Sequence, residues 1–296
     1  MKPREMTPDT QEPRLIQLKI GSKRYSIATD DEYLRSNGPG LKVRIKNSLK
    51  ALVGGNTFEP RMTRLFSTLI QPTDTVLDIG ANIGCTTLLF SERGSHVHAF
   101  EPLGKTFALL RRNVEVNVRG NIKIHHCALG DENKNAEICF SDTNRSIAFV
   151  LDRTSRDDRG TSPITVRRLD DMLPELRIDS LNFMKIDVEG YEMRVLNGAR
   201  KTLAKYNPVV EMEFVAWCLD VQQRTTLPDF LDLVTELFPI VYVVDGRRYI
   251  DIHTTRGRYE AMAQNMFHHR YKELVCAYVP DQLVKFSSFY TDATPR

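Results

Sequence analysis

The chain has 296 residues, of which 41% are hydrophobic and 27% are charged, and this composition is typical of a soluble globular protein with a full hydrophobic core. Its net charge of +3 is too small to indicate a nucleic-acid or membrane partner. The start, MKPREMTPDTQEPR, lacks the apolar core of a signal peptide, and no apolar run is long enough to span a bilayer. We therefore expect a cytoplasmic protein with no membrane span.

Cysteine and basic residues exclude further classes. The cysteines are odd in number, widely spaced and without a Cys-x-x-Cys pair, which disfavours a disulfide framework and a zinc site, so we expect reduced and mostly buried thiols. Basic residues gather in 42–50 and 247–272, but neither stretch interleaves aromatic residues, so we interpret both as solvated faces rather than nucleic-acid contacts. An anionic substrate is the alternative. The five cysteines are Cys85, Cys127, Cys139, Cys218 and Cys276.

In chain order, residues 1–13 read as a disordered tail and residues 14–56 as an N-terminal extension. Alternating apolar and polar residues around Gly21 predict a β-hairpin within this extension, followed by a loop with a short helix. Residues 57–296 read as one α/β domain.

Strand and helix periods alternate through this domain, which predicts βαβ units and a mostly parallel sheet. The middle is less regular: two strands border a polar stretch, 142–162, that we predict to be a mobile flap over the sheet edge. The predicted strands are 75–79, 96–100, 121–127, 136–141, 163–169, 180–187, 208–214, 239–245, a short strand near RRYID (247–251), and 273–279. The predicted helices are 59–70, 83–92, 103–117, 190–205 and 227–238.

The first strand ends in the turn DIGANIG, at residues 78–84. Gly80 allows the backbone to approach a ligand, and Gly84 allows close packing of the next helix. Glu101 ends the second strand, where a βαβ unit places the acid that binds both ribose hydroxyls. Asp78 would repel a pyrophosphate but attract an ammonium, so the two acids together fit S-adenosylmethionine.

Five stretches in this order resemble the FkbM family of S-adenosylmethionine-dependent methyltransferases. They are VLDIGANIG, HAFEPLGKTFALLRRNVEVN, CALGD, VRRLDDML and IDSLNFMKIDVEGYEMRVLNGARKTLAKYNPVVEMEF, and they cover about residues 57–215. The resemblance implies a Rossmann-like class I methyltransferase fold with a seven-stranded sheet. It also implies O-methylation of hydroxyls on sugars, glycans or secondary metabolites.

The resemblance carries a cofactor site over to this sequence. Pro102 and Leu103 would flank the adenine, and the backbone of Ala128 is our first choice for a further adenine contact. Asp131, three residues later, is a doubtful contact because LGDEN also reads as a turn. The predicted cofactor residues are Asp78, Gly80, Ala81, Asn82, Gly84, Glu101, Pro102, Leu103 and Ala128.

The acids Asp187, Glu189 and Glu213 are the predicted catalytic residues. Asp187 and Glu189 follow one strand and Glu213 lies near the end of the next, at the edge where open α/β sheets bind ligands. A carboxylate there could remove the proton of an acceptor hydroxyl. Asp187 could instead cap the next helix, and Lys185 could pair with Asp187 or with Glu211.

The same three acids could hold a divalent metal, but the stretch has no Asp-Asp pair and no nearby histidine, so the sequence does not favour one. His125 and His126 are interpreted as packing or surface residues. Two other functions stay open: a non-catalytic cofactor-binding or scaffold protein on the same fold, and a nicotinamide-dependent oxidoreductase, which Asp78 and the missing third glycine disfavour. The predicted partner is a small-molecule, sugar or glycan acceptor, and the sequence does not indicate an oligomeric state.

Overall fold

The computed structural model describes residues 13–29, 58–93, 95–118, 120–141, 148–151 and 160–295. Three predictions lie wholly or mostly outside these ranges. The first is the predicted tail, of which residues 1–12 are not described. The second is the predicted loop with a short helix, which contains the basic stretch 42–50. The third is the predicted flap, of which residues 142–147 and 152–159 are not described.

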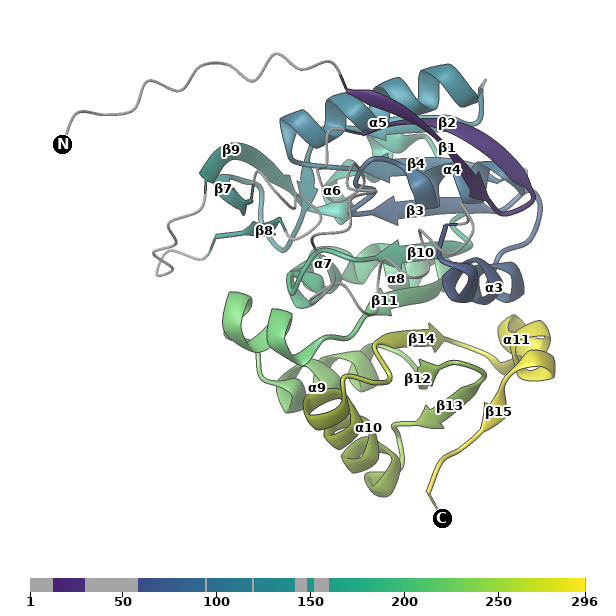
Figure 1. Ribbon diagram of the computed structural model, residues 1–296. Coiled ribbons are helices and arrows are strands. Elements are labelled where there is room, and N and C mark those ends of the chain that lie inside the picture. Colours follow the sequence, from purple (N-terminus) through teal and green to yellow (C-terminus); the bar gives the residue numbers. More distant parts are fainter. Residues whose placement is uncertain are drawn as a thin grey trace, which may run out of the picture.

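A nine-stranded sheet forms the centre of the molecule, in the order β15-β13-β12-β14-β11-β10-β3-β4-β5 (Figure 1). Strands β5, β4, β3, β10 and β11 run parallel, and β14 is antiparallel to both of its neighbours. This confirms the predicted α/β fold. The sheet has nine strands rather than seven because β13 and β15 extend its edge beyond β12. The bounds are β3 Thr75–Ile79, β4 His96–Phe100, β5 Ile122–His125, β10 Phe183–Ile186, β11 Val209–Glu213, β12 Ile240–Asp245, β13 Arg248–Asp251, β14 Glu273–Ala277 and β15 Thr291–Asp292.

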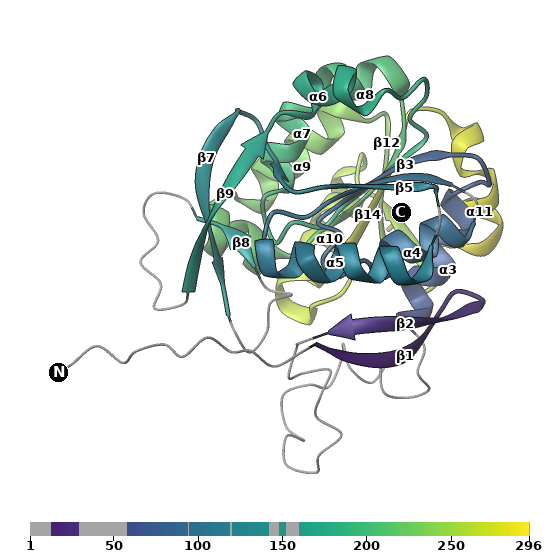
Figure 2. The ribbon, with the colours of Figure 1, turned by 90° about the horizontal axis from the view of Figure 1, so that it is seen from above.

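Helices cover both faces of this sheet. Figure 2 shows α6 and α8 on one side of it and α4 and α5 on the other. Two large apolar clusters fill the layers: one contains side chains of α6 to α10, and the other contains side chains of α3, α4 and α11. The bounds are α3 Pro60–Leu69, α4 Cys85–Glu92, α5 Gly104–Asn117, α6 Leu169–Leu176, α7 Glu192–Gly198, α8 Arg200–Tyr206, α9 Leu227–Leu237, α10 Thr255–His268 and α11 Val284–Phe289, with short turns η2 Cys218–Gln222 and η3 Pro280–Leu283.

The single helix predicted over 190–205 is wrong, because α7 and α8 are separate helices that meet at Ala199. Gly198 allows this arrangement: a Cβ there would lie 1.8 Å from the carbonyl oxygen of Gly130. The chain therefore approaches a neighbouring loop closely at the point where one helix ends. The helix also begins later than predicted, at Glu192.

A second sheet, in the order β6-β9-β7-β8, lies beside the first. Strands β7, Lys134–Phe140, and β9, Gly160–Arg167, are the two predicted around the flap, and they pair antiparallel. The short strands are β6, Ala128–Leu129, and β8, Phe149–Val150. The predicted strand 163–169 ends earlier, at Arg167, because Leu169 already starts α6.

The predicted N-terminal hairpin is present as β1, Arg14–Ile20, and β2, Lys23–Thr29, and lies next to α5 (Figure 2). Asn113 of α5 accepts a hydrogen bond from the Ala28 amide (2.6 Å) and donates to the carbonyls of Ala28 (3.1 Å) and Ile83 (2.9 Å). One turn later, Asn117 makes a similar pair of bonds with the backbone of Ser26. Apolar side chains of the hairpin belong to the cluster that contains α3 and α4. The domain division at residue 57 stays a prediction.

All five cysteines are free, and all but the half-buried Cys85 are buried, as predicted. None of the helices within the described ranges has the length and apolar character needed to cross a membrane.

Candidate active site

The turn after β3 carries the first predicted cofactor residues. Asp78 is fully buried, and its Oδ2 accepts hydrogen bonds from the hydroxyls of Thr86 (2.8 Å) and Thr87 (2.6 Å). Its Oδ1 is also buried but has no hydrogen-bond partner among the described residues. Gly80 has a φ of 79°, and a Cβ there would lie 1.8 Å from the backbone oxygen of Asp187. The backbone at Gly80 therefore closely approaches the loop after β10, and its predicted approach to a ligand stays a prediction.

The rest of the turn connects β3 to β4 and to α5. The amides of Gly80 and Ala81 both donate to the carbonyl of Phe100, which holds the turn against the end of β4. Gly84 has a φ of 95° and directly precedes α4, and a Cβ there would meet the side chain of Leu110 at 2.7 Å. Gly84 therefore allows close packing, as predicted, although the partner is helix α5 rather than a strand.

Glu101 directly follows β4, and its carboxylate faces this turn. Its Oε2 accepts from the amide of Asn82 (3.1 Å) and its Oε1 from the amide of Leu103 (2.9 Å). Burial raises the pKa of Glu101 to about 7, although these two amides, and then Lys185, lower it. A carboxylate has about four acceptor positions, so each oxygen can still accept a ligand hydroxyl.

Lys185 lies on β10 between two acids on the neighbouring strands, Asp78 on β3 and Glu211 on β11. Its ammonium is 3.1 Å from Asp187 Oδ2 and 3.8 Å from Asp78 Oδ1. Burial alone would lower the pKa of Lys185, but the attraction of Asp187, Asp78 and Glu211 raises it. The predicted pairing of Lys185 with Asp187 is thus present.

Asp187 does not cap a helix, because α7 begins at Glu192. Instead, Glu192 Oε1 accepts from the amides of Val188 (3.1 Å) and Gly190 (3.3 Å) and so fixes the loop after β10. Burial raises the pKa of Glu192 to about 7. Glu189, in this loop, has a left-handed φ of 53°. Burial, followed by the charge of Asp187, raises the pKa of Glu189 to about 8.

Three further acids lie on β11 and β14. Glu211 is buried, and burial, followed by the charge of Glu273, raises its pKa well above its ordinary range, although the charge of Lys185 lowers it. Glu213 lies opposite Glu273 in the antiparallel ladder. Burial raises the pKa of Glu213 well above its ordinary range, and the charge of Asp187 adds to the effect. Because β11 is parallel to β10 and β14 antiparallel to it, all these acids meet at one edge of the sheet.

The other predicted cofactor residues lie next to this edge. Leu103 and Ala128 are buried and Pro102 is half-buried. Asp131 pairs with Arg194 of α7 at 2.7 Å. Both histidines pack on aromatic rings, as predicted: His125 stacks on Phe100 and His98, and His126 on Phe107.

Sequence reasoning missed four residues of the site: Glu59, Glu192, Glu273 and Cys218. Glu59 directly precedes α3. Burial raises its pKa, the charge of Asp187 raises it further, and the charge of Lys185 lowers it. A sequence signal for Glu192 was present, because this residue ends the motif KIDVEGYE. Glu273 and Cys218 come from segments whose position depends on long-range strand pairing, so no local signal marked them.

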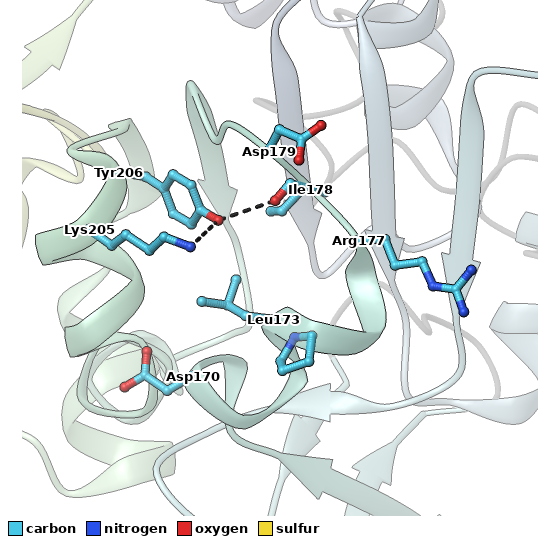
Figure 3. Close-up of a pocket in the computed structure, with 8 residues that line it drawn as sticks. Asp170, Leu173, Arg177, Ile178, Asp179, Lys205 and Tyr206 are labelled. Atoms are coloured by element: carbon cyan, nitrogen blue, oxygen red, sulfur yellow. Dashed lines mark hydrogen bonds between the residues drawn. The ribbon is translucent and has the colours of Figure 1, made fainter.

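A pocket of about 490 Å³ lies between α6, α8 and the loop before β10 (Figure 3). Three of its polar side chains already have structural partners: Tyr206 hydrogen-bonds Lys205 and the carbonyl of Ile178, and Asp170 accepts from the start of α8. Because it lies before β10 rather than after it, this pocket is at the opposite edge of the sheet from the acids. We do not assign it to the active site.

Residues 78–244, more than half of the chain, match the family model described as the methyltransferase FkbM domain. The chain belongs to the FkbM methyltransferase family. The matched residues include the turn after β3, Glu101, the loop after β10 and both acids of β11, and S-adenosylmethionine is the cofactor that this family implies.

The chain is also similar to three curated methyltransferases. Methyltransferase 1 of Beauveria bassiana is 31% identical, and the alignment covers 42% of this chain and 57% of that protein. The 31-O-demethyl-FK506 methyltransferase FkbM of Streptomyces tacrolimicus is 33% identical, with 44% and 60% covered. The 2-O-methyltransferase NoeI of Sinorhizobium fredii is 29% identical, with 48% and 64% covered. The chain thus spans less than two thirds of the length of each of these relatives.

Proposed function

We propose that this protein is an S-adenosylmethionine-dependent O-methyltransferase that acts on a hydroxyl of a sugar, a glycan or a secondary metabolite. The family match supports methyl transfer. Two of the relatives are named for transfer to an oxygen, one of them on a secondary metabolite, FK506. The observation that carries the proposal is the pair of buried carboxylates at the ends of adjacent strands, Asp78 and Glu101, facing one turn.

These two acids fit the cofactor. The Oδ1 of Asp78 is a buried carboxylate oxygen without a hydrogen-bond partner among the described residues, and such an atom suits an ammonium. Glu101 has acceptor positions left for the ribose hydroxyls. The residues proposed to hold the cofactor are Asp78, Gly80, Ala81, Asn82, Gly84, Glu101, Pro102, Leu103 and Ala128.

When bound, S-adenosylmethionine supplies a methyl group on a positively charged sulfur, and the protein must supply a base for the acceptor hydroxyl. Of the three proposed catalytic acids, Glu189 has a pKa raised to about 8 and Glu213 a pKa raised well above its ordinary range, so burial disfavours the charged form of both. Asp187 has a side chain that is 43% exposed and an ion pair with Lys185. We therefore assign the base to Asp187, with Glu189 and Glu213 positioning the acceptor.

Calorimetric binding of S-adenosylmethionine tests the cofactor site. Glu101→Ala and Asp78→Ala should each weaken binding by about 1.5 to 3 kcal/mol, the range for a lost hydrogen bond to a charged group. Thr87→Val is the matched control, because it removes a donor to Asp78 but keeps the carboxylate, and its affinity should stay near that of the wild type. Unchanged affinity in both alanine variants, or tight binding of NAD in place of S-adenosylmethionine, would contradict the proposal.

Transfer of a labelled methyl group tests the acceptor class. The purified protein and labelled cofactor are incubated with glycans, free sugars and hydroxylated secondary metabolites, and the products are treated with base. An O-methyl ether of a sugar survives this treatment, whereas a methyl ester does not. A labelled product that loses its methyl group in base would show that the acceptor is a carboxylate rather than a hydroxyl.

A further inference from the structure

A cysteine from the segment after β11 lies at the edge of the sheet where the acids meet. Cys218 begins the π-helical turn η2, and its thiol donates a hydrogen bond to Glu189 Oε2 at 3.4 Å. Cys218, Glu189 and Glu213 each present one ligand atom, and these atoms all lie within 4.8 Å of one another. Three residues from three separate segments thus converge on one point.

A second observation indicates that this point takes a ligand. Glu213 Oε2 is buried and has no hydrogen-bond partner within the described part of the chain. Both polar atoms of Gln222 are equally buried and unpartnered, and its side chain is only 4% exposed. Gln222 ends the same π-helical turn that Cys218 begins. Buried polar atoms without partners are rare, so the unpartnered oxygen of Glu213, which belongs to the cluster itself, calls for an explanation.

The backbone around the cluster is held firmly. Gly190 has a φ of 100°, and a Cβ there would lie 2.3 Å from the carbonyl oxygen of Cys218, so the loop of Glu189 and the turn of Cys218 are in close contact. The buried Asn265 of α10 donates to the carbonyl of Phe214 (2.6 Å) and accepts from the amide of Ala216 (2.9 Å). The chain between Glu213 and Cys218 is therefore fixed before any ligand binds.

We propose that Glu189, Glu213 and Cys218 form a binding site for a divalent transition metal of the zinc or cobalt type. A thiolate ligand disfavours Mg²⁺ and Ca²⁺, which prefer oxygen ligands, and suits softer ions. The 3.4 Å between Cys218 Sγ and Glu189 Oε2 is close to the separation of about 3.5 Å between two ligands of tetrahedral zinc. Three protein ligands leave the fourth position open, as in catalytic zinc sites.

The role of this metal rests on the proposed function. The open position binds the acceptor hydroxyl and lowers its pKa, and the released proton passes to the carboxylate of Asp187. Glu189 and Glu213 then bind the metal as carboxylates rather than holding protons themselves. The sequence did not favour a metal because it shows no Asp-Asp pair and no nearby histidine, and the third ligand proposed here is a cysteine rather than Asp187.

Titration of the metal-free protein with Co²⁺ tests the site directly. Binding through Cys218 should produce a thiolate-to-cobalt charge-transfer band in the near ultraviolet. Cys218→Ala should abolish this band. Cys139→Ala is the matched control, because Cys139 is also a buried thiol outside any disulfide but lies on β7 in the second sheet, and the band should persist. A band that persists in Cys218→Ala, or no band in the wild type, would overturn the proposal.

Two further variants keep the test decisive if Cys218→Ala fails to fold, which a far-ultraviolet circular dichroism spectrum would show. Glu213→Gln should weaken the binding of Zn²⁺ at least about 100-fold, because even residues that only hydrogen-bond to metal ligands contribute 10- to 100-fold to metal affinity. Competition with a chromophoric chelator measures this affinity. Cys218→Asp should lose the cobalt band and bind Mn²⁺ more tightly relative to Zn²⁺ than the wild type does. Unchanged Zn²⁺ affinity in Glu213→Gln would exclude this carboxylate as a ligand.

Cofactor binding separates this proposal from the proposed function. Cys218→Ala should bind S-adenosylmethionine as tightly as the wild type, because Cys218 is not among the proposed cofactor residues. If the wild type binds Co²⁺ through Cys218 but not S-adenosylmethionine, the metal site stands and the proposed function fails. If it binds S-adenosylmethionine and transfers methyl groups without any metal, the function stands and the proposed role of the metal fails.

Discussion

Asp187 differs from its two neighbouring acids by its exposure and its partner, Lys185. Asp187→Asn keeps the size of the side chain but removes its charge, so turnover with the true acceptor should fall by roughly 10² to 10⁴-fold, the range for loss of a general base. Methyl transfer from labelled cofactor measures this. Turnover near that of the wild type would show that Asp187 is not the base.

A matched control for this variant lies three strands away in the same sheet. Asp245 ends β12 and pairs with Arg270 at 2.7 Å, so Asp245→Asn also neutralises a salt-bridged aspartate. Its turnover should stay near that of the wild type. An equal loss in both variants would point to general destabilisation rather than to catalysis, and thermal unfolding of each would reveal it.

Glu192 should make stability depend on pH. Its folded-state pKa of about 7 lies above the ordinary value of 4.5, so the stability it contributes is fully present below about pH 4.5 and is lost as the pH rises through about 7. Glu192→Gln keeps an oxygen that can accept from Val188 and Gly190 but does not titrate. Between about pH 5 and about pH 8, the variant should gain on the order of 1 to 3 kcal/mol in unfolding free energy relative to the wild type.

Urea unfolding of both proteins at the two pH values measures this difference. The comparison reports Glu192 together with its effect on Glu189 and Glu213, because the charge of Glu192 also raises their pKa values. A difference in unfolding free energy that does not change with pH would show that Glu192 is not held in its protonated form by burial.

At the scale of the elements, the turn between β3 and α4 depends on the absence of a side chain at Gly80. Gly80→Ala should destabilise the protein by two separate effects, a left-handed φ and a clash with the carbonyl of Asp187. Gly246 in the β12–β13 turn has a similar φ of 66°, but a Cβ there would meet no atom within 4 Å, so Gly246→Ala isolates the first effect.

The expected cost of Gly246→Ala is about 1 to 2 kcal/mol, and Gly80→Ala should cost clearly more. Chemical denaturation measures both. Equal costs would mean that the loop after β10 can move away from the turn, and the two halves of the site would then be less firmly connected than the structure indicates.

Elements with local signals were predicted well. The apolar strand TVLDI and the helical spacing after it are properties of neighbouring residues, so β3, α4, β4 and α5 lie within a few residues of their predicted bounds. The break between α7 and α8 was missed, because it depends on the contact between Gly198 and Gly130, which are far apart in sequence. Helix α10 was missed because its residues show little apolar periodicity.

The sequence also indicated those residues of the candidate site that a local signal marks. Asp78, Glu101, Asp187 and Glu213 lie at the ends of parallel strands, and the rule that such ends share one edge brings them together. Glu273 starts a strand instead, and it joins them because β14 is inserted antiparallel, which no local pattern reveals.

At the scale of the whole molecule, Asn113 connects the hairpin, α5 and the turn before α4. Asn113→Ala leaves backbone groups of Ala28 without their partners in a buried position, so we expect a loss of about 2 to 3 kcal/mol in unfolding free energy. Asn117→Ala is the control, because Asn117 bonds Ser26 in a more exposed position and should cost less. Urea unfolding gives both values, and hydrogen exchange at the Ala28 amide should rise only in the first variant. Equal costs would show that the hairpin is not held mainly through Asn113.

The gathering of carboxylates around the single ammonium of Lys185 has a consequence for how a catalytic cycle ends. Under the proposed function, S-adenosylmethionine arrives with one net positive charge, and the demethylated product, S-adenosylhomocysteine, leaves without it. The buried acids therefore favour the molecule that enters over the molecule that departs, because a positive charge is stabilised as the acids around it ionise and a neutral thioether is not. Product inhibition should accordingly be weak, and equal calorimetric affinities for the two compounds would show that these acids do not discriminate between them.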